Sequence, residues 1–70
     1  MALTKTEKLL LRGLKLFGLR KGNTMLVMML MDTEQKRWDM ILFLKEIIES
    51  EIEITEEQIV DIAYQMHNHS

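Results

Sequence analysis

The chain contains no cysteine and no proline, and only three of its 70 residues are glycine. Without cysteine it can form neither a disulfide nor a thiolate metal site, so it lacks the covalent staples of many small domains. The glycines at positions 13, 18 and 22 are isolated, which excludes a glycine-rich phosphate loop. The longest apolar run, residues 25–31, is far shorter than the roughly 20 residues of a membrane span.

Histidine is nearly absent as well, since His67 and His69 are the only two and both lie at the end of the chain. Residues two positions apart on a helix point in different directions, and no third metal ligand is close in sequence. We therefore expect a solvated tail that frays over residues 67–70. The other chemistry-bearing residues are closely spaced carboxylates, Glu46, Glu49, Glu51 and Glu53. Nothing in the sequence shapes a pocket around them, and we predict no enzyme activity, no cofactor and no bound metal.

Hydrophobic residues make up 47% of the chain, which is high for this length. Seventy residues allow one domain, 1–70, and a domain this small buries only roughly 60% of the surface of its unfolded chain. A lone helical monomer would struggle to cover so much apolar surface. We therefore expect a homodimer or a permanent partner surface, in the cytoplasm, with no membrane partner.

The spacing of the apolar residues predicts an all-α fold, a small four-helix domain. The expected helices cover about residues 4–17, 24–31, 33–50 and 55–67. The second is short and apolar on nearly all sides, which is typical of a central helix or of one that lies in an interface. A strand is the competing interpretation of this short run, but methionine and leucine favour a helix and no partner strand is evident.

Residues that begin and end helices stand at the expected boundaries. The predicted N-terminal caps are Thr4 with Glu7, Asn23, Asp32 or Thr33, and Thr55 with Gln58. Asp32 with Gln35 is a further capping pair. Gly18 is placed to end the first helix in the left-handed conformation, with Leu19 folding back on Leu14. Residues 51–54 alternate charge and isoleucine, and we expect an extended linker there.

Charge is divided unevenly along the chain. Residues 1–22 have a balance of +5 and residues 23–70 a balance of −7. The cations of the first helix, Lys8, Arg12 and Lys15 among them, fall on one face and could follow a phosphate backbone. With Arg37 at the start of the third helix, they define an alternative function, a small helix-turn-helix-type DNA-binding regulator. The competing interpretation is that this basic face meets the acidic helices, within the chain or across a dimer.

The apolar residues outside the main helix faces point to a protein partner. Those expected to bind it are Met25, Met28, Met29, Trp38 and Leu42. Methionines provide adaptable apolar surface, which suits a core as well as a tolerant binding groove. Trp38 and Leu42 lie four residues apart on an otherwise polar face, and tryptophan is a frequent hot-spot residue. We therefore predict a small protein-interaction or regulatory module that associates with itself through apolar helix surface.

The order of these features also resembles a group of proteins. An apolar run is followed by Asp32-Thr33-Glu34-Gln35, then by a long helix ending in Leu44-Lys45-Glu46, and then by Thr55-Glu56-Glu57-Gln58. This pattern, over the last two-thirds of the chain, resembles short, all-helical, uncharacterised proteins of Gram-positive bacteria and their mobile elements. The resemblance implies a helical fold, but no activity and no site residues.

Overall fold

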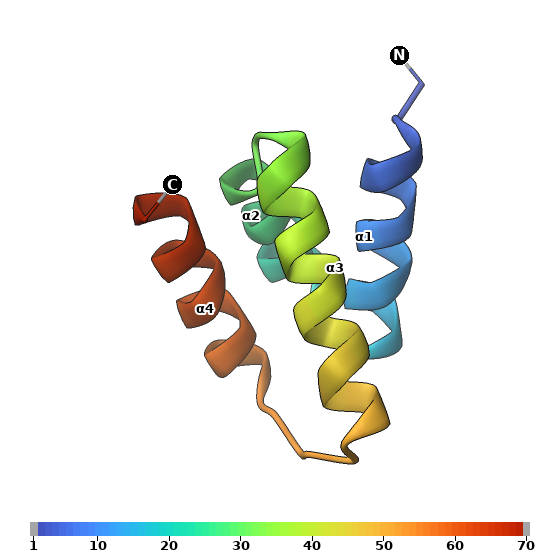
Figure 1. The fold of residues 1–70 in the computed structure, drawn as a ribbon, viewed down its shortest axis with the longest axis vertical. Coiled ribbons are helices and arrows are strands. Elements are labelled where there is room, and N and C mark those ends of the chain that lie inside the picture. Colours follow the sequence, from blue (N-terminus) through green and yellow to red (C-terminus); the bar gives the residue numbers. More distant parts are fainter. Residues whose placement is uncertain (1, 70) are drawn as a thin grey trace.

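The computed structural model describes residues 2–69, and Figure 1 shows the four helices that they form. The helices are α1 (Lys5–Leu16), α2 (Lys21–Leu30), α3 (Glu34–Glu49) and α4 (Glu56–Asn68). No strand occurs within the described residues, and residues 51–54 form an irregular connection. The predicted all-α, four-helix domain is confirmed.

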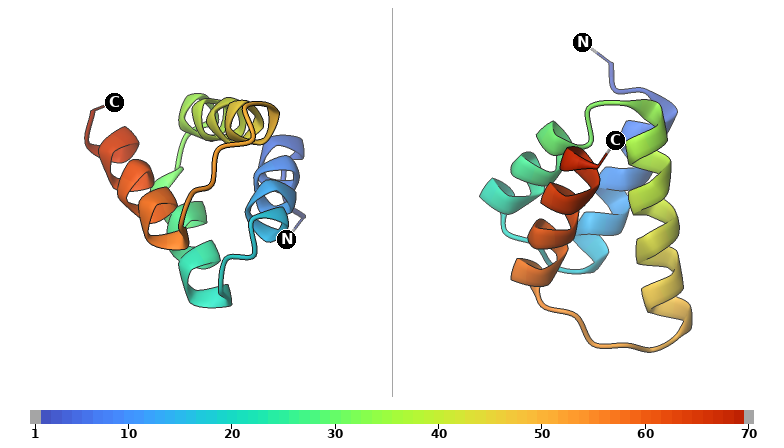
Figure 2. Two further views of the ribbon diagram at one scale, coloured as in Figure 1. Left: turned by 90° about the horizontal axis from the view of Figure 1, so that it is seen from below. Right: turned by 60° about the vertical axis from the view of Figure 1, so that its left-hand side comes forward.

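The helices occupy four corners when the molecule is seen from below (Figure 2, left). α1 and α3 run in the same direction, and α2 and α4 run back (Figure 1). α1 packs on α2 and α3, and α4 packs on the same two helices. α2 and α3 therefore lie at diagonally opposite corners, so that their outer faces point to opposite sides of the bundle.

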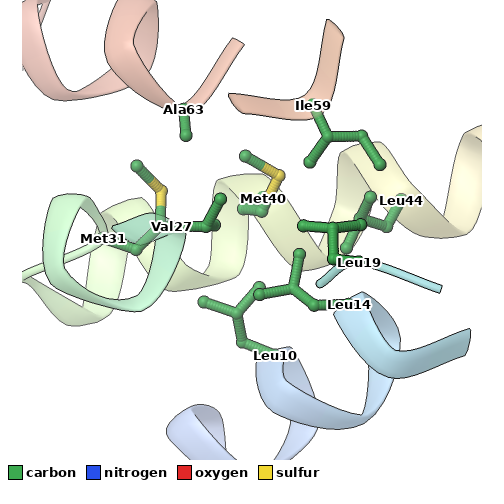
Figure 3. Packing of buried hydrophobic residues seen from close by; sticks show 9 residues of the cluster. All are labelled: Leu10, Leu14, Leu19, Val27, Met31, Met40, Leu44, Ile59 and Ala63. Carbon is green, nitrogen blue, oxygen red and sulfur yellow. The ribbon is translucent and has the colours of Figure 1, made fainter. Parts of the chain in front are cut away.

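The core collects side chains from all four helices and from the α1–α2 connection (Figure 3). Its buried members are Leu10, Leu14, Leu19, Val27, Met31, Met40, Leu44, Ile59 and Ala63. Two of them are methionines, Met31 and Met40, and both are completely buried core residues. Burial of this cluster is the main stabilising contribution in a domain without disulfides.

Reciprocal capping boxes begin α1 and α4, as predicted. The backbone N–H of Glu7 donates to Thr4 Oγ1 at 3.2 Å, and the N–H of Thr4 donates to Glu7 Oε1 at 2.9 Å. Thr55 and Gln58 repeat this exchange at 3.1 and 2.8 Å. Both boxes satisfy N–H groups that have no partner inside their helix.

α3 begins at the predicted place with Thr33 as its cap. Thr33 Oγ1 accepts from the N–H of Lys36 at 3.2 Å. The alternative pairing of Asp32 with Gln35 is not formed, because Gln35 donates to Asp39 and Asp32 accepts from the ammonium group of Lys36. Of the two predicted caps, the structure therefore selects Thr33.

Gly18 terminates α1 just after its C-cap, as predicted. Gly18 has a φ of 75°, and the N–H groups of Gly18 and Leu19 donate to the carbonyls of Lys15 and Leu14. These are the two hydrogen bonds of a Schellman motif. The end of α3 repeats them with Glu51 in the place of glycine, at a φ of 53°.

The start of α2 was predicted wrongly. The helix begins at Lys21 and not at position 24. Its N-cap is Arg20, whose side chain makes no capping hydrogen bond. Asn23 lies within the first turn and is not a cap. The reason is a tertiary contact: Glu56 Oε2 accepts from the backbone N–H of Arg20 at 2.9 Å and so serves the free end of α2 from another helix.

Candidate interaction surface

A groove of about 360 Å³ runs between α1 and α3 on the outside of the bundle. Its lining consists of Leu9, Arg12, Gly13 and Leu16 from α1 with Ile41, Leu44, Lys45, Ile48 and Glu49 from α3. The walls are mainly apolar, and the charged side chains of Arg12, Lys45 and Glu49 border them. Leu16 is 78% exposed and Ile48 53% exposed, so two large apolar side chains stand open to solvent here.

Gly13 permits the close approach of α1 and α3 at the floor of this groove. A Cβ atom at this position would lie 3.2 Å from Leu44 Cδ1. Further along, Arg37 Nε donates to Thr6 Oγ1 at 3.1 Å. Both contacts join residues 31 positions apart in the sequence. The two helices therefore run side by side in parallel, with residue i of α1 about level with residue i+31 of α3.

Trp38 and Leu42 lie on the outer face of α3 beside the groove. They are 39% and 56% exposed, and Ile41 connects them to the groove lining. We call the groove together with Trp38 and Leu42 the α1–α3 face. The sequence predicted both of these residues as binding residues, but it did not predict the groove, because the proximity of Leu16 and Ile48 depends on how α1 packs.

The methionines of α2 do not join this face. Met25 and Met29 are exposed on α2, at the corner diagonally opposite α3 (Figure 2). Met28 is partly buried and packs against the core. The structure thus divides the five residues that the sequence grouped as one surface: Trp38 and Leu42 lie on one side of the bundle, and Met25 and Met29 lie on another.

The basic residues of α1 lie on the surface of the bundle. Lys8, Arg12 and Lys15 are exposed. Within residues 2–69, the ion pairs are Arg20 with Glu56 and Lys36 with Asp32, and the cations of α1 take part in neither. α1 and α4 do not pack together, so within one chain the basic face of α1 does not meet the acids of α4.

Arg37 is held within the fold. Besides the bond to Thr6, its Nη1 donates to the backbone carbonyl of Met31 at 3.2 Å. The residue is half-buried between the start of α1 and the end of α2. The side chain expected to lead a recognition helix therefore links three segments of the bundle.

A polar cluster that the sequence did not predict joins the ends of α2, α3 and α4. Lys36 is only 8% exposed, and its Nζ donates to Asp32 Oδ1 at 3.0 Å. This bond holds the pKa of the Asp32 carboxyl group below its ordinary value. Lys36 appears in the sequence as an ordinary surface residue of the first turn, and only its i+4 spacing from Asp32 signals the ion pair.

His67 belongs to the same cluster, and the prediction of a solvated histidine tail is wrong for it. α4 continues through Asn68, and His67 is half-buried. Its Nδ1 lies 2.9 Å from the carbonyl oxygen of Leu30, and because a carbonyl only accepts, Nδ1 carries the proton of this bond. Lys36 Nζ, 3.5 Å from the same nitrogen, does not donate to it at the same time. Ser70, the last residue of the expected tail, lies outside the described residues.

Few other features suggest a chemical site. In the described part of the chain no three residues among histidine, aspartate and glutamate are grouped so that they could hold a metal ion. None of its helices combines the length and apolar character needed to cross a bilayer. No family model, no curated protein and no solved structure matches this chain. Its function must therefore be argued from its own surface.

Proposed function

We propose that this chain is a non-enzymatic protein-interaction module, and that the α1–α3 face is its contact surface. The observation that carries the proposal is the exposure of large apolar side chains along a groove, with Leu16 the most open of them at 78%. Contiguous apolar surface of this kind is typical of binding sites in small soluble domains. Self-association is the simplest use of such a face.

The composition of the face supports the same proposal. Trp38 supplies an aromatic anchor, and the groove offers a concave seat lined by Ile41 and Ile48. Charged side chains border the apolar centre, as in protein interfaces with an apolar core and a polar rim. Met25 and Met29 form a separate apolar patch on α2. Met25 also lines a second hollow, between α1 and α2, with Leu11 and Lys15, and this side of the bundle is not part of the proposed surface.

The test compares two pairs of substitutions on opposite sides of the bundle. Leu16→Lys with Ile48→Lys places charge on the α1–α3 face, and Met25→Lys with Met29→Lys does so on α2. Each variant is used as bait for partner proteins, and its association is measured by sedimentation. We expect the first pair to abolish association with any partner, including the chain itself, and the second to leave it intact. Equal behaviour of the two pairs contradicts the proposal.

DNA binding remains a second candidate function, favoured by the exposed row of Lys8, Arg12 and Lys15. Its helix-turn-helix form has less support, because α2 and α3 do not pack against one another as the helices of that motif do. The decisive measurement is duplex affinity at several salt concentrations. Binding that weakens steeply with salt and depends on Arg12 would support it. Unchanged affinity after Arg12→Ala and Lys15→Ala contradicts it.

A further inference from the structure

The α1–α3 face has two halves of opposite charge. The exposed charged residues of α1 are all cations: Lys5, Lys8, Arg12 and Lys15. On α3, Glu49 and Lys45 line the groove and Glu34 lies on the same side by helical spacing, so this half carries two acids and one base. Asp39 lies on the other side, in a hollow that Met66 and His69 also line. The apolar groove lies between the two halves. A complementary partner surface must therefore be acidic opposite α1, basic opposite α3 and apolar in the middle. A second copy of the α1–α3 face meets these requirements when it is rotated so that its α3 lies opposite α1.

Two ways of turning a second copy onto this face differ in the helices that they bring together. A two-fold axis across the groove places α1 on α1 of the partner, in opposite directions, so that the cations of one α1 face the cations of the other. A two-fold axis along the groove places α1 on α3 of the partner. Like charges opposite each other cost binding energy, and complementary charges favour encounter, so the charges select the second arrangement.

We propose that a second copy of this chain occupies the α1–α3 face, with the two-fold axis along the groove and α1 of each protomer lying on α3 of its partner. This inference rests on the proposed function and names its partner. Rotation about an axis parallel to the helices does not shift any residue along the helix direction. The register of 31 residues between α1 and α3 within one chain therefore also applies between α1 of one protomer and α3 of its partner. Leu16 of one protomer then lies near Ile48 of the other, and the apolar side chains of both grooves are covered together.

Such a contact is self-complementary, and it closes after two copies. The acid–base contact occurs twice, once on each side of the axis. This symmetry gives a charge-reversal experiment two informative arms. One variant reverses α1 (Lys5→Glu with Arg12→Glu), and the other reverses α3 (Glu34→Lys with Glu49→Lys).

We expect the wild-type chain to dimerise in sedimentation equilibrium and each reversed variant alone to dimerise at least about tenfold more weakly, because both of its contacts then oppose like charges. An equimolar mixture should form a heterodimer of wild-type strength, since the reversed α1 faces the reversed α3 and the other contact is native. Circular dichroism of each variant controls for folding. Variants that dimerise as strongly as the wild type would overturn this arrangement and favour the α1-on-α1 alternative.

A second measurement does not depend on the charges. The chain has no cysteine, so a single introduced thiol has no competitor. When Leu16→Cys and Ile48→Cys variants are mixed and oxidised, we expect a cross-linked heterodimer, and no cross-link between Met29→Cys and either of them. Absence of the first cross-link overturns the inference. A monomeric chain whose α1–α3 face still captures another protein would overturn the inference and leave the proposed function standing. A monomeric chain that captures no other protein would contradict both the inferred dimer and the proposed function.

Discussion

Asn23 Nδ2 donates a hydrogen bond of 2.6 Å to Glu56 Oε2, which joins the first turn of α2 to the first turn of α4. The same oxygen accepts from the backbone N–H of Arg20, and Oε1 lies 3.8 Å from Arg20 Nε. One carboxylate thus serves its own helix as a first-turn acid and a neighbouring helix as an external cap. The contact spans more than 30 residues of sequence and positions α4 against α2.

The first prediction concerns this carboxylate. Glu56→Ala should lower the melting temperature clearly more than Glu57→Ala, because Glu57 is an exposed acid in the same helical turn without these partners. Thermal unfolding by circular dichroism provides the measurement. The Asn23→Ala and Glu56→Ala changes should also be non-additive, since both remove the same bond. Equal effects of Glu56→Ala and Glu57→Ala would contradict the assigned role.

Acid should unfold the protein through its capped and paired carboxylates. Hydrogen bonds lower the pKa of Glu7 from its ordinary 4.5, that of Glu56 from 4.5 and that of Asp32 from 3.8. The main donors are the Thr4 backbone for Glu7, the Asn23 amide for Glu56 and the Lys36 ammonium for Asp32. Because each pKa is lower in the folded state, the stability that it contributes is complete above the unfolded pKa and is lost as the pH falls through the folded pKa.

We therefore expect the urea midpoint to hold near neutral pH and to fall below about pH 4.5. The matched control is Glu56→Gln, which removes one of the titrating groups and should give a shallower fall below about pH 4.5. A variant whose midpoint declines as steeply as that of the wild type would show that Glu56 does not contribute to acid lability.

The helix boundaries that were predicted correctly depend on residues close in sequence. Thr4 with Glu7 and Thr55 with Gln58 are each three residues apart, and Gly18 ends α1 through its own backbone geometry. Such signals need only the local chain. The start of α2 was missed because its external cap, Glu56, lies 36 residues from Arg20. No pattern within the α2 region contains that information.

In the candidate site, too, the residues set by local spacing were predicted and those set by long-range packing were not. Trp38 and Leu42 were identified from helical spacing alone, and the structure leaves both exposed. The partnership of Leu16 with Ile48 requires the parallel packing of α1 on α3, which depends on the absence of a side chain at Gly13. The sequence could not place α2 diagonally from α3 either, and it therefore grouped Met25 and Met29 with Trp38.

The end of α3 offers a stabilising substitution. Glu51 adopts a φ of 53°, a conformation that costs an L-residue roughly 1–2 kcal/mol and glycine much less. Part of this gain is offset by the greater freedom of glycine in the unfolded chain. Glu51→Gly should therefore increase the free energy of unfolding by about 0.5–1 kcal/mol in urea titrations. Ser50→Gly is the control, because Ser50 has a φ of −86° and should gain nothing.

The methionines of residues 25–31 provide the sharpest comparison of one residue type in two environments. Met31 is fully buried in the core, whereas Met29 is 72% exposed two positions earlier. Met31→Ala removes the side chain from a packed interior and should cost about 2–5 kcal/mol of unfolding free energy. Met29→Ala should change it by less than about 0.5 kcal/mol, because it opens no cavity.

Urea denaturation of the two variants, at one protein concentration, measures both effects. The difference between the two unfolding free energies measures how much more a buried methionine stabilises the fold than an exposed one. If Met29→Ala were as destabilising as Met31→Ala, then Met29 would be covered in solution, and the outer face of α2 would have to be part of an interface. A small effect at Met29 would agree with the proposal that the contact surface is the α1–α3 face and not the outer face of α2.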